Sequence, residues 1–397
     1  MLLELLDVLR YLLGFLVVIA TAPVFLELVL ALAGNLFGGM GGGSGQAAGG
    51  NELRLAVVVP AHNEEILVAR AVESVKAQAA TVPVYVVAHN CTDGTAMAAA
   101  EAGGLVLGLD DAGLRGKAAA LRHGFAVAVG DGADVCLVLD ADSVACDGWV
   151  AATRVAFGRG ARATQCRYEQ RAGEGRTADK GGRLRILAFR GMNVLRARGR
   201  AALGFSPGIF GSGFALSSTT LREVPFDGDG IVEDLEYHVR LVAAGMCVSW
   251  LDGARVYADL APGGAAQADQ QARWEGGRLA AAHEASSALV RAVLRGRWRA
   301  LETLLDLWSL PLSRAVVLVV PGLALHGFRL YGAVCLLVTG GYLAGVIALG
   351  TEPGRDLLAL IAAPMFVLRK VIQTGRMIRM AGRDAEWVRT KREQPQR

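Results

Sequence analysis

The sequence lacks any close pairing of cysteines. Its six cysteines are scattered, no CxxC pair occurs, and no histidines cluster at the spacing of metal ligands. This pattern excludes a zinc-finger type of site and a disulfide framework as the basis of the fold. We therefore expect the part of the chain outside any membrane to be reduced and cytoplasmic.

A strong excess of charge is also missing. The formal net charge is only +4 over 397 residues, which does not suggest a nucleic-acid partner. The composition is instead apolar, with 53% hydrophobic residues and a mean hydropathy of +0.38. A chain this apolar is typical of a membrane protein.

Charge is absent from residues 11–26, inside an apolar stretch that covers residues 1–33. The stretch is longer than the core of a signal peptide and no clean cleavage site ends it, so it predicts a retained transmembrane helix. Residues 34–52 are rich in glycine and predict a flexible linker. A folded domain is expected over residues 53–263.

The last quarter of the chain is again rich in apolar residues. Two apolar runs predict a transmembrane hairpin over residues 310–350, after interfacial helices within 264–309. Residues 351–380 fit either a third span or an interfacial helix, because Pro364 interrupts them. The basic tail 381–397 should lie in the cytoplasm. A cytoplasmic domain then needs an even number of crossings before that tail, which favours two spans and places the amino terminus outside.

Short apolar runs alternate with helical stretches in the predicted domain. Strands are expected at 54–60, 82–88, 105–109 and 135–139, and helices at 64–78, 92–102 and 116–129. This alternation predicts a mostly parallel sheet with helices on both faces. Ligands bind such sheets at the carboxyl ends of the strands, where polar clusters stand at 60–64, 89–93 and 140–142.

Asp140 and Asp142 stand one residue apart after the fourth predicted strand. Paired carboxylates at a strand end can hold Mg²⁺ or Mn²⁺, which prefer oxygen ligands and bind phosphates as well. Such a metal neutralises a leaving diphosphate. The alternative is an exposed turn without a ligand.

Glu233 and Asp234 begin the predicted helix 234–244. A carboxylate within reach of an attacking hydroxyl can accept its proton, and this makes Asp234 the candidate general base with Glu233 beside it. Acids also favour the positive end of the helix dipole without any catalytic role. Both interpretations remain open, and they are compatible.

Gln270, Arg273 and Trp274 lie close together on one predicted helix. Arginine can bind a diphosphate and tryptophan can stack on a sugar ring. An interfacial helix with its indole at the level of the lipid headgroups is the alternative. Lys117, near a helix start, is a candidate phosphate or ribose contact or a solvated lysine.

Taken together, these residues resemble glycosyltransferase family 2, and in particular the membrane-bound synthases of β-linked glycans such as cellulose, hyaluronan, chitin oligosaccharides and poly-N-acetylglucosamine. The resemblance covers nearly the whole chain. Its motifs are Val59-Pro60-Ala61-His62-Asn63-Glu64-Glu65, Asn90-Cys91-Thr92-Asp93-Gly94-Thr95, Gly116-Lys117-Ala118, Asp140-Ala141-Asp142, Gly211-Ser212-Gly213, Glu233-Asp234 and Gln270-x-x-Arg273-Trp274.

The resemblance implies a GT-A fold, a UDP-sugar donor, Mg²⁺ or Mn²⁺ at Asp140 and Asp142, and inversion at the anomeric carbon. It implies a site of three parts. The catalytic residues are Asp234 and Glu233. The donor contacts are Ala61, Asn63, Glu64, Asn90, Asp93, Lys117, Asp140, Asp142, Gln270, Arg273 and Trp274. The acceptor contacts are Gly211, Ser212, Gly213 and Trp274.

The activity implied is that of a hexosyltransferase in bacterial exopolysaccharide synthesis, acting at the inner membrane on a growing glycan. Partners would include membrane lipids and either a second copy of the chain or an export protein. Few spans follow Trp274, which favours the alternative of a single addition to a lipid acceptor. His89 stands where such proteins usually have an acidic residue that contacts the uracil. Either Asp93 or a backbone group makes this contact here, or base selectivity is altered, or His89 begins a helix without a ligand role.

The segment 183–200 holds six arginines and no acids. Two interpretations of this segment are open. One is a solvated helix face, and the other is a helix that binds lipid phosphates at the membrane surface.

Overall fold

The computed structural model describes residues 2–38, 53–114, 116–173, 176–228, 230, 232–260, 265–325 and 327–372. Of residues 2, 3 and 265–274 only the backbone is described. Most of the predicted linker and all of the basic tail 381–397 lie outside these residues.

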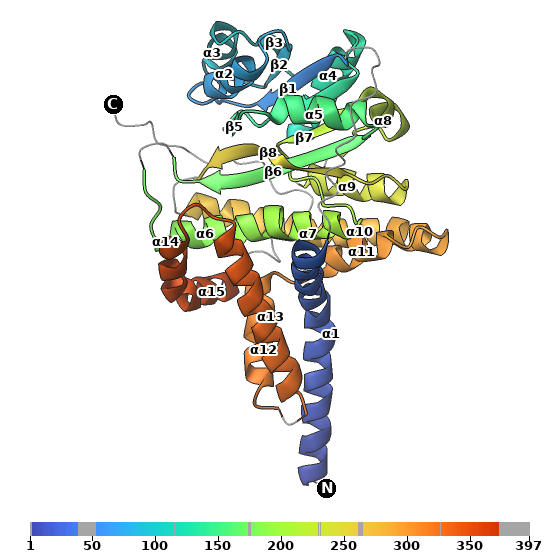
Figure 1. Cartoon of the computed structure of the whole chain (residues 1–397), viewed down its shortest axis with the longest axis vertical. Helices are drawn as coiled ribbons and strands as arrows, with labels where there is room; N and C mark the ends of the chain where they lie inside the picture. The colour runs from blue at the N-terminus through green and yellow to red at the C-terminus, as the bar shows by residue number, and fades with distance from the viewer. Residues whose placement is uncertain are drawn as a thin grey trace.

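One sheet forms the centre of the molecule (Figure 1). Eight strands pair in the order β3-β2-β1-β4-β7-β6-β8-β5 among the described residues. β1 pairs in parallel with β2 and β4, β2 with β3, and β6 with β8, whereas β7 runs antiparallel to β4 and β6, and β5 to β8. The strands are β1 Leu55–Ala61, β2 Val84–His89, β3 Leu105–Leu109, β4 Val135–Val138, β5 Ser143–Ala145, β6 Ala163–Arg171, β7 Phe214–Ser217 and β8 Ser249–Asp259. The sheet is therefore mixed and mostly parallel, as the sequence predicts.

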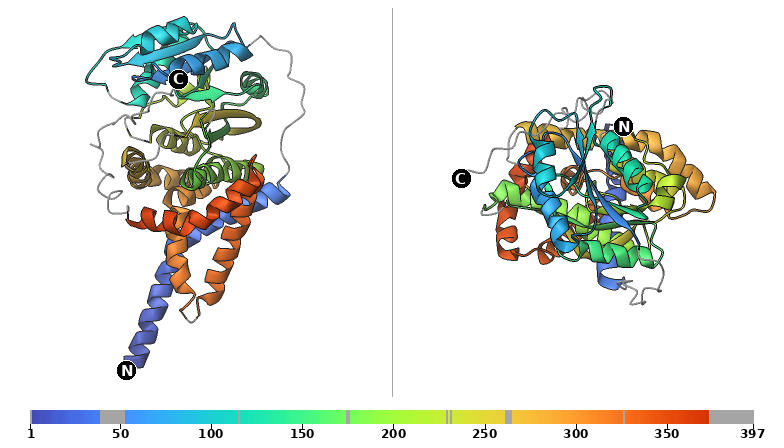
Figure 2. Two further views of the ribbon diagram at one scale, coloured as in Figure 1. Left: turned by 90° about the vertical axis from the view of Figure 1, so that its left-hand side faces the viewer. Right: turned by 90° about the horizontal axis from the view of Figure 1, so that it is seen from above.

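Helices cover both faces of this sheet (Figure 2). α2 (Val68–Gln78), α3 (Thr95–Glu101) and α5 (Trp149–Gly158) enclose one apolar core. α4 (Lys117–Gly130) and α9 (Glu233–Ala243) enclose the other, and the short α8 (Ser218–Glu223) follows β7. β1 and β2 are rich in valine and almost wholly buried, which is the expected pattern for strands covered on both faces.

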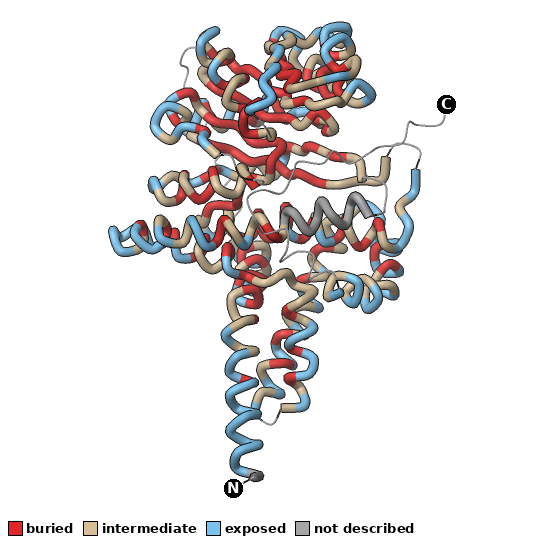
Figure 3. The backbone as a smooth tube through the Cα atoms, turned by 180° about the vertical axis from the view of Figure 1, so that it is seen from behind, coloured by how far each residue is buried: buried red, intermediate tan, exposed pale blue. Residues whose placement is uncertain are grey.

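A layer of helices separates the sheet from the apolar segments. α6 (Lys180–Arg190), the π-helix η1 (Gly191–Arg196) and α7 (Ala197–Ala202) follow one another directly and run beneath β6 (Figure 1). α10 (Ala265–Leu294) and α11 (Ala300–Trp308) pack beside α9. Figure 3 shows this layer between the buried sheet and the more exposed helices that extend away from it.

The apolar helices extend from this layer. They are α1 (Leu2–Phe37), α12 (Leu312–Gly322), α13 (Arg329–Ala348), α14 (Pro353–Ala359) and α15 (Ala363–Ile372), with a short 3-10 turn between the last two. By length and composition, the described residues include two helices that could cross a membrane, Glu4–Phe37 and Arg329–Ala348. α11 and α12 together would make a third, but they are bent by 73°.

Four of the six arginines of segment 183–200 have a different role from either of those expected. Arg190, Arg196 and Arg200 are buried, and Arg183 is largely so. Arg183 and Arg190 each lie 2.9 Å from Asp356 of α14. Both interpretations of these four residues were wrong, because they pair with carboxylates from distant parts of the chain.

Candidate functional site

The loops after β1 and β2 are joined to each other. The side-chain oxygen of Asn63 accepts a hydrogen bond of 2.7 Å from the backbone N–H of Thr92. Thr95 Oγ1 accepts one of 2.7 Å from the backbone N–H of Glu64. These contacts bring two of the predicted polar clusters together at one edge of the sheet, where parallel strands end.

Two asparagines shape these loops. Asn63 and Asn90 have positive φ values, 56° and 48°, a conformation that asparagine tolerates better than most residues. The side chain of Asn90 donates to the carbonyls of Asp111 (2.9 Å) and Leu114 (3.1 Å), and its oxygen accepts from the N–H of Asp111 (2.9 Å). Both amides thus hold backbone in place beside the expected donor site.

Asp93 and Ala61 complete this part of the site. Asp93 accepts hydrogen bonds from the N–H of Thr95 (3.1 Å) and, through its other oxygen, from the N–H of Glu65 (3.3 Å). Ala61 is the buried last residue of β1. Ala61, Glu64 and Asp93 therefore line the same two loops.

His89 does not begin a helix. It is the last residue of β2, it is only 5% exposed, and its Nε2 lies 3.0 Å from the carbonyl oxygen of Leu114. Its own carbonyl is 2.7 Å from Nδ1 of His62. His89 therefore supports the loop that Asn90 also holds.

Lys117 joins two other parts of the site. It is the first residue of α4, directly after Gly116, whose φ is +87°. Its Nζ lies 2.5 Å from Oδ1 of Asp140 and donates a hydrogen bond of 2.7 Å to the carbonyl of Gly211. The ammonium thus bridges the end of β4 and the glycine-rich loop before β7.

Asp234 faces the same place from α9. A Cβ atom at Gly211, whose φ is +81°, would lie 3.2 Å from Lys117 Nζ and 3.3 Å from Asp234 Oδ2. The other oxygen of Asp234 accepts a hydrogen bond of 2.8 Å from the N–H of Leu235 at the start of its helix. The structure therefore brings Lys117, Asp140, Gly211 and Asp234 into one cluster.

The charges of this cluster influence one another. Burial raises the pKa of Asp140 to about 6, against the opposing effect of Lys117. Burial and the nearby Asp234 raise the pKa of Glu233 to about 8, and burial also raises that of Asp234. Burial alone would lower the pKa of Lys117, but Asp140 and Glu233 outweigh it and raise that pKa. A carboxyl that is harder to ionise is a stronger base once ionised.

The loop that contains Gly211 is held in place by a buried residue of β6 that the sequence analysis did not identify. Gln165 of β6 is fully buried; its Nε2 donates to the carbonyl of Ser212 (2.9 Å), and its Oε1 accepts from the N–H of Phe210 (3.1 Å). Ser212 Oγ in turn accepts from the N–H of Asp140 (3.0 Å). A Cβ atom at Gly213 would lie 2.5 Å from Cys166 Sγ. Thr164, Arg167 and Glu169 of β6 are polar too, so nothing in the sequence pattern distinguishes Gln165.

Gln270, Arg273 and Trp274 lie in the first third of α10, and their side chains are outside the described residues. The next residue, Glu275, accepts a hydrogen bond of 2.7 Å from Arg314 of α12 and lies 3.4 Å from Lys370 of α15. This part of α10 therefore contacts the apolar segments.

The metal expectation rests on two carboxylates. Asp140 and Asp142 both follow β4, and Asp142 Oδ1 accepts a hydrogen bond of 3.2 Å from Ser143 Oγ. Within the described part of the chain, no three His, Cys, Asp or Glu side chains gather in a group that could hold a metal ion. The described residues therefore do not form a metal site made of protein ligands alone.

Known proteins resemble this chain in sequence. Residues 56–216 match the family model described as glycosyl transferase family 2. The chain is 32% identical over 92 residues to protein RfbJ of Shigella flexneri, a match that covers 23% of this chain and 67% of that protein.

Solved structures resemble it in fold. The mannosyltransferase PcManGT from Pyrobaculum calidifontis, in complex with GDP-Man and Mn²⁺, matches with a TM-score of 0.52 and 17% identity over 95% of this chain and 97% of that chain. At this identity the likeness concerns the fold alone, and it confirms the expected GT-A type. Glucosyl-3-phosphoglycerate synthase of Mycobacterium tuberculosis matches with a TM-score of 0.38 and 18% identity over 52% of this chain and 70% of that chain, which is too low to support a conclusion.

Proposed function

Because this chain belongs to glycosyl transferase family 2, we propose that it transfers a hexose from a UDP-sugar, with inversion, to an acceptor hydroxyl at a membrane surface. One observation carries the proposal. Asp140, Lys117, Gly211 and Asp234 come from four separate elements and converge within contact distance. A site for sugar transfer needs a cation near the diphosphate and a base near the acceptor, and this cluster supplies candidates for both.

Asp140 and Asp142 fit a divalent cation that shares its ligands with a diphosphate. Mg²⁺ is usually held by one or two carboxylates together with substrate phosphates, so the two aspartates suffice without a third protein ligand. The ammonium of Lys117 forms an ion pair with Asp140 and so already supplies one positive charge at this position. When bound, Mg²⁺ or Mn²⁺ would stabilise the negative charge of the departing diphosphate.

Asp234 is proposed as the base. The acceptor oxygen forms a bond to the anomeric carbon, the bond from that carbon to the diphosphate breaks, and the acceptor proton moves to the Asp234 carboxylate. A single displacement of this kind inverts the configuration. Lys117 opposes the effect of burial on the pKa of Asp234 and so favours its ionised form. Glu233, with its pKa near 8, would stay protonated beside it at neutral pH.

The remaining donor contacts are proposed on the loops already described. Ala61, Asn63, Glu64, Asn90 and Asp93 would surround the nucleoside. Gln270, Arg273 and Trp274 would contact the diphosphate and the acceptor, beside Gly211, Ser212 and Gly213.

The acceptor proposed first is a growing β-linked polysaccharide or oligosaccharide, on the strength of the motif at Gln270, Arg273 and Trp274. The second candidate is a single addition to a lipid acceptor. It is favoured by the small number of candidate spans, since two or at most three helices of the described chain are long and apolar enough to cross a membrane. A polymer channel would then need a second copy of the chain or an export partner.

We also propose a bacterial inner-membrane location with the sheet domain in the cytoplasm. α1 and α13 would cross the bilayer, α12 would form a further span or a re-entrant segment, and α14 and α15 would lie at the membrane surface. The domain boundaries expected from the sequence remain part of this proposal.

Product analysis tests the function. The purified chain in lipid nanodiscs is incubated with Mn²⁺ and radiolabelled UDP-glucose, UDP-N-acetylglucosamine, UDP-galactose or GDP-mannose, the last because PcManGT was solved with GDP-Man. Transfer from a UDP-sugar into a ladder of products supports the first candidate, and one lipid-soluble product supports the second. Transfer from GDP-mannose alone would overturn the UDP proposal.

A further inference from the structure

The turn between α10 and α11 carries an exposed basic surface. Its four arginines, which we call the basic tip, are Arg291, Arg295, Arg297 and Arg299, and all are exposed. Arg297 donates to the carbonyl of Ala243, and the guanidinium of Arg299 lies 5.6 Å from the ring centre of Trp298. The guanidinium groups of Arg291 and Arg295 make no hydrogen bond or ion pair with any residue the structure describes.

These arginines differ from those of the α6–α7 helix. Arg190, Arg196 and Arg200 are buried against carboxylates and their charges are neutralised within the chain. Arg291 and Arg295 keep uncompensated charge at the surface. Among the described residues, the basic tip therefore offers uncompensated positive charge to an external partner.

Large apolar side chains accompany this charge. Leu294 is 80% and Trp298 is 61% exposed, although Trp298 also packs edge-on against Phe205. On α11, Leu301 and Trp308 are exposed seven residues apart and so share one helix face. The opposite face carries Glu302 and Asp306, which pair with Arg200.

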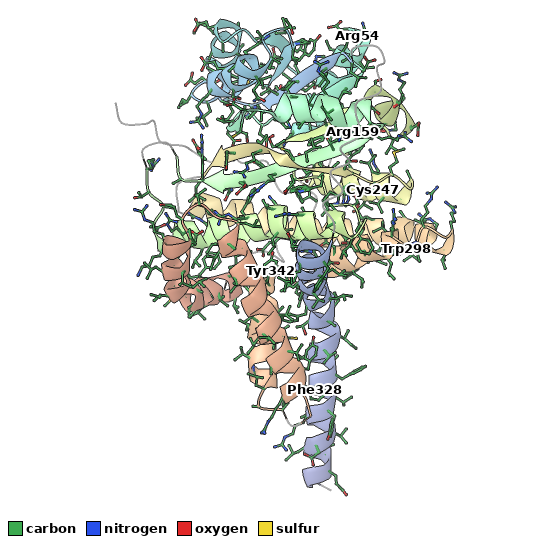
Figure 4. All side chains as sticks on the ribbon, viewed as in Figure 1. Arg54, Arg159, Cys247, Trp298, Phe328 and Tyr342 are labelled. Atoms are coloured by element: carbon green, nitrogen blue, oxygen red, sulfur yellow. The ribbon has the colours of Figure 1, made fainter. Side chains whose placement is uncertain are left out.

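The position of this surface is consistent with a bilayer interface. α11 leads into α12, and the two are apolar enough together to count as one bent span. Figures 1 and 3 show the α10–α11 pair projecting sideways beside α1, at the level of α7 and above α12 and α13. Figure 4 labels Trp298 on this projection.

We propose that α11 lies in the membrane interface and that Arg291 and Arg295 bind the headgroups of anionic phospholipids. The apolar face with Leu301 and Trp308 would then rest among the acyl chains, with Leu294 and Trp298 at the headgroup level. The inference rests on the proposed membrane attachment, and it is independent of the sugar and acceptor. Its basis is the complementarity between uncompensated arginines and lipid phosphates beside an apolar face that continues into α12.

Tryptophan quenching by brominated lipids tests this. The full chain is placed in phosphatidylcholine nanodiscs that contain brominated phosphatidylglycerol or, at the same mole fraction, brominated phosphatidylcholine. Greater quenching by the anionic lipid is expected, and it should weaken as salt is added. The apparent preference should fall roughly fivefold for each arginine removed in R291Q, R295Q and the double variant. W298F should lose part of the quenching itself.

The matched control is R54Q/R159Q, which removes two exposed arginines from the sheet domain, where Figure 4 labels both. This control should keep the full preference. Equal quenching by the two lipids in the wild type, or a preference that survives in R291Q/R295Q, would overturn the proposal. A chain that fails to enter nanodiscs would refute the membrane attachment as well, whereas loss of sugar transfer alone would leave the lipid result standing.

Discussion

Arg196 of η1 and Glu27 of α1 form a buried ion pair at 3.4 Å, although 169 residues separate them in the chain. Asp306 of α11 bonds the same guanidinium, and Arg200 lies 3.2 Å from its other oxygen. Three elements meet at this network: the first apolar helix, the helix beneath the sheet and the proposed interfacial helix.

We predict that R196M destabilises the protein by about 3–5 kcal/mol, because it leaves carboxylates buried without their partner. Thermal unfolding of the purified chain in detergent measures the effect. The control is R10Q, since Arg10 and Asp7 form a pair that is about 60% exposed and should contribute less than about 1 kcal/mol. Equal stability of the two variants would contradict the proposed role of the network.

Gly199 allows α7 to touch α1. A Cβ atom at Gly199 would lie 2.3 Å from the carbonyl oxygen of Ala31, and one at Gly34 would lie 2.0 Å from that of Gly199. Alanine at position 199 must push the helices apart, so we expect a loss of about 1–3 kcal/mol in thermal unfolding. G130A in α4 meets no atom within 4 Å and should be neutral or slightly stabilising. A stable G199A protein would show that the close contact is not required.

Glu233 should make stability depend on pH. Its pKa rises from 4.5 to about 8 because it is buried and close to Asp234. The folded state therefore holds this proton more tightly than the unfolded state, so the stabilisation is complete below pH 4.5 and is lost as the pH rises towards 8. E233Q removes the titrating group. Its melting temperature should fall less than that of the wild type between pH 5 and pH 8, and parallel curves would refute the assignment.

Asp234 is the residue whose loss should separate chemistry from binding. D234N keeps the shape of the side chain but removes the proposed base, so transfer should fall by at least about 100-fold. Calorimetric binding of UDP in the presence of Mn²⁺ should survive. D227N, on an exposed residue near the same helix, is the control and should keep full activity. Loss of UDP binding in D234N would mean that the residue supports the fold of the site instead.

The sheet and the site were predictable to different degrees. Continuous apolar runs predicted the first four strands, because parallel strands covered on both faces leave little room for polar residues. The helix expected from residue 64 begins at Val68, and the backbone N–H of Glu64 donates to Thr95 in the loop after β2. Glu64 and Thr95 are 31 positions apart, so the local sequence around Glu64 does not predict this contact.

Long-range pairing explains what the sequence could not reveal. Six arginines without a nearby acid suggested solvent or lipid contact, yet Arg183 and Arg196 find their carboxylates on helices far away in the chain. Gln165 likewise acts through the loop of Phe210 and Ser212, some 45 residues later. Periodicity and composition describe one segment at a time, so they cannot predict which segments will meet.

The turns at Asn63 and Asn90 carry a last consequence for ligand binding. Each asparagine has a left-handed backbone conformation, and its side chain forms hydrogen bonds with a neighbouring loop. These bonds connect the two turns to each other and to the segment near Leu114. The conformational entropy of these turns is lost when the chain folds and not when a nucleotide arrives. A donor bound at this proposed site would contact turns that are already ordered, so its affinity would not be reduced by the cost of ordering them.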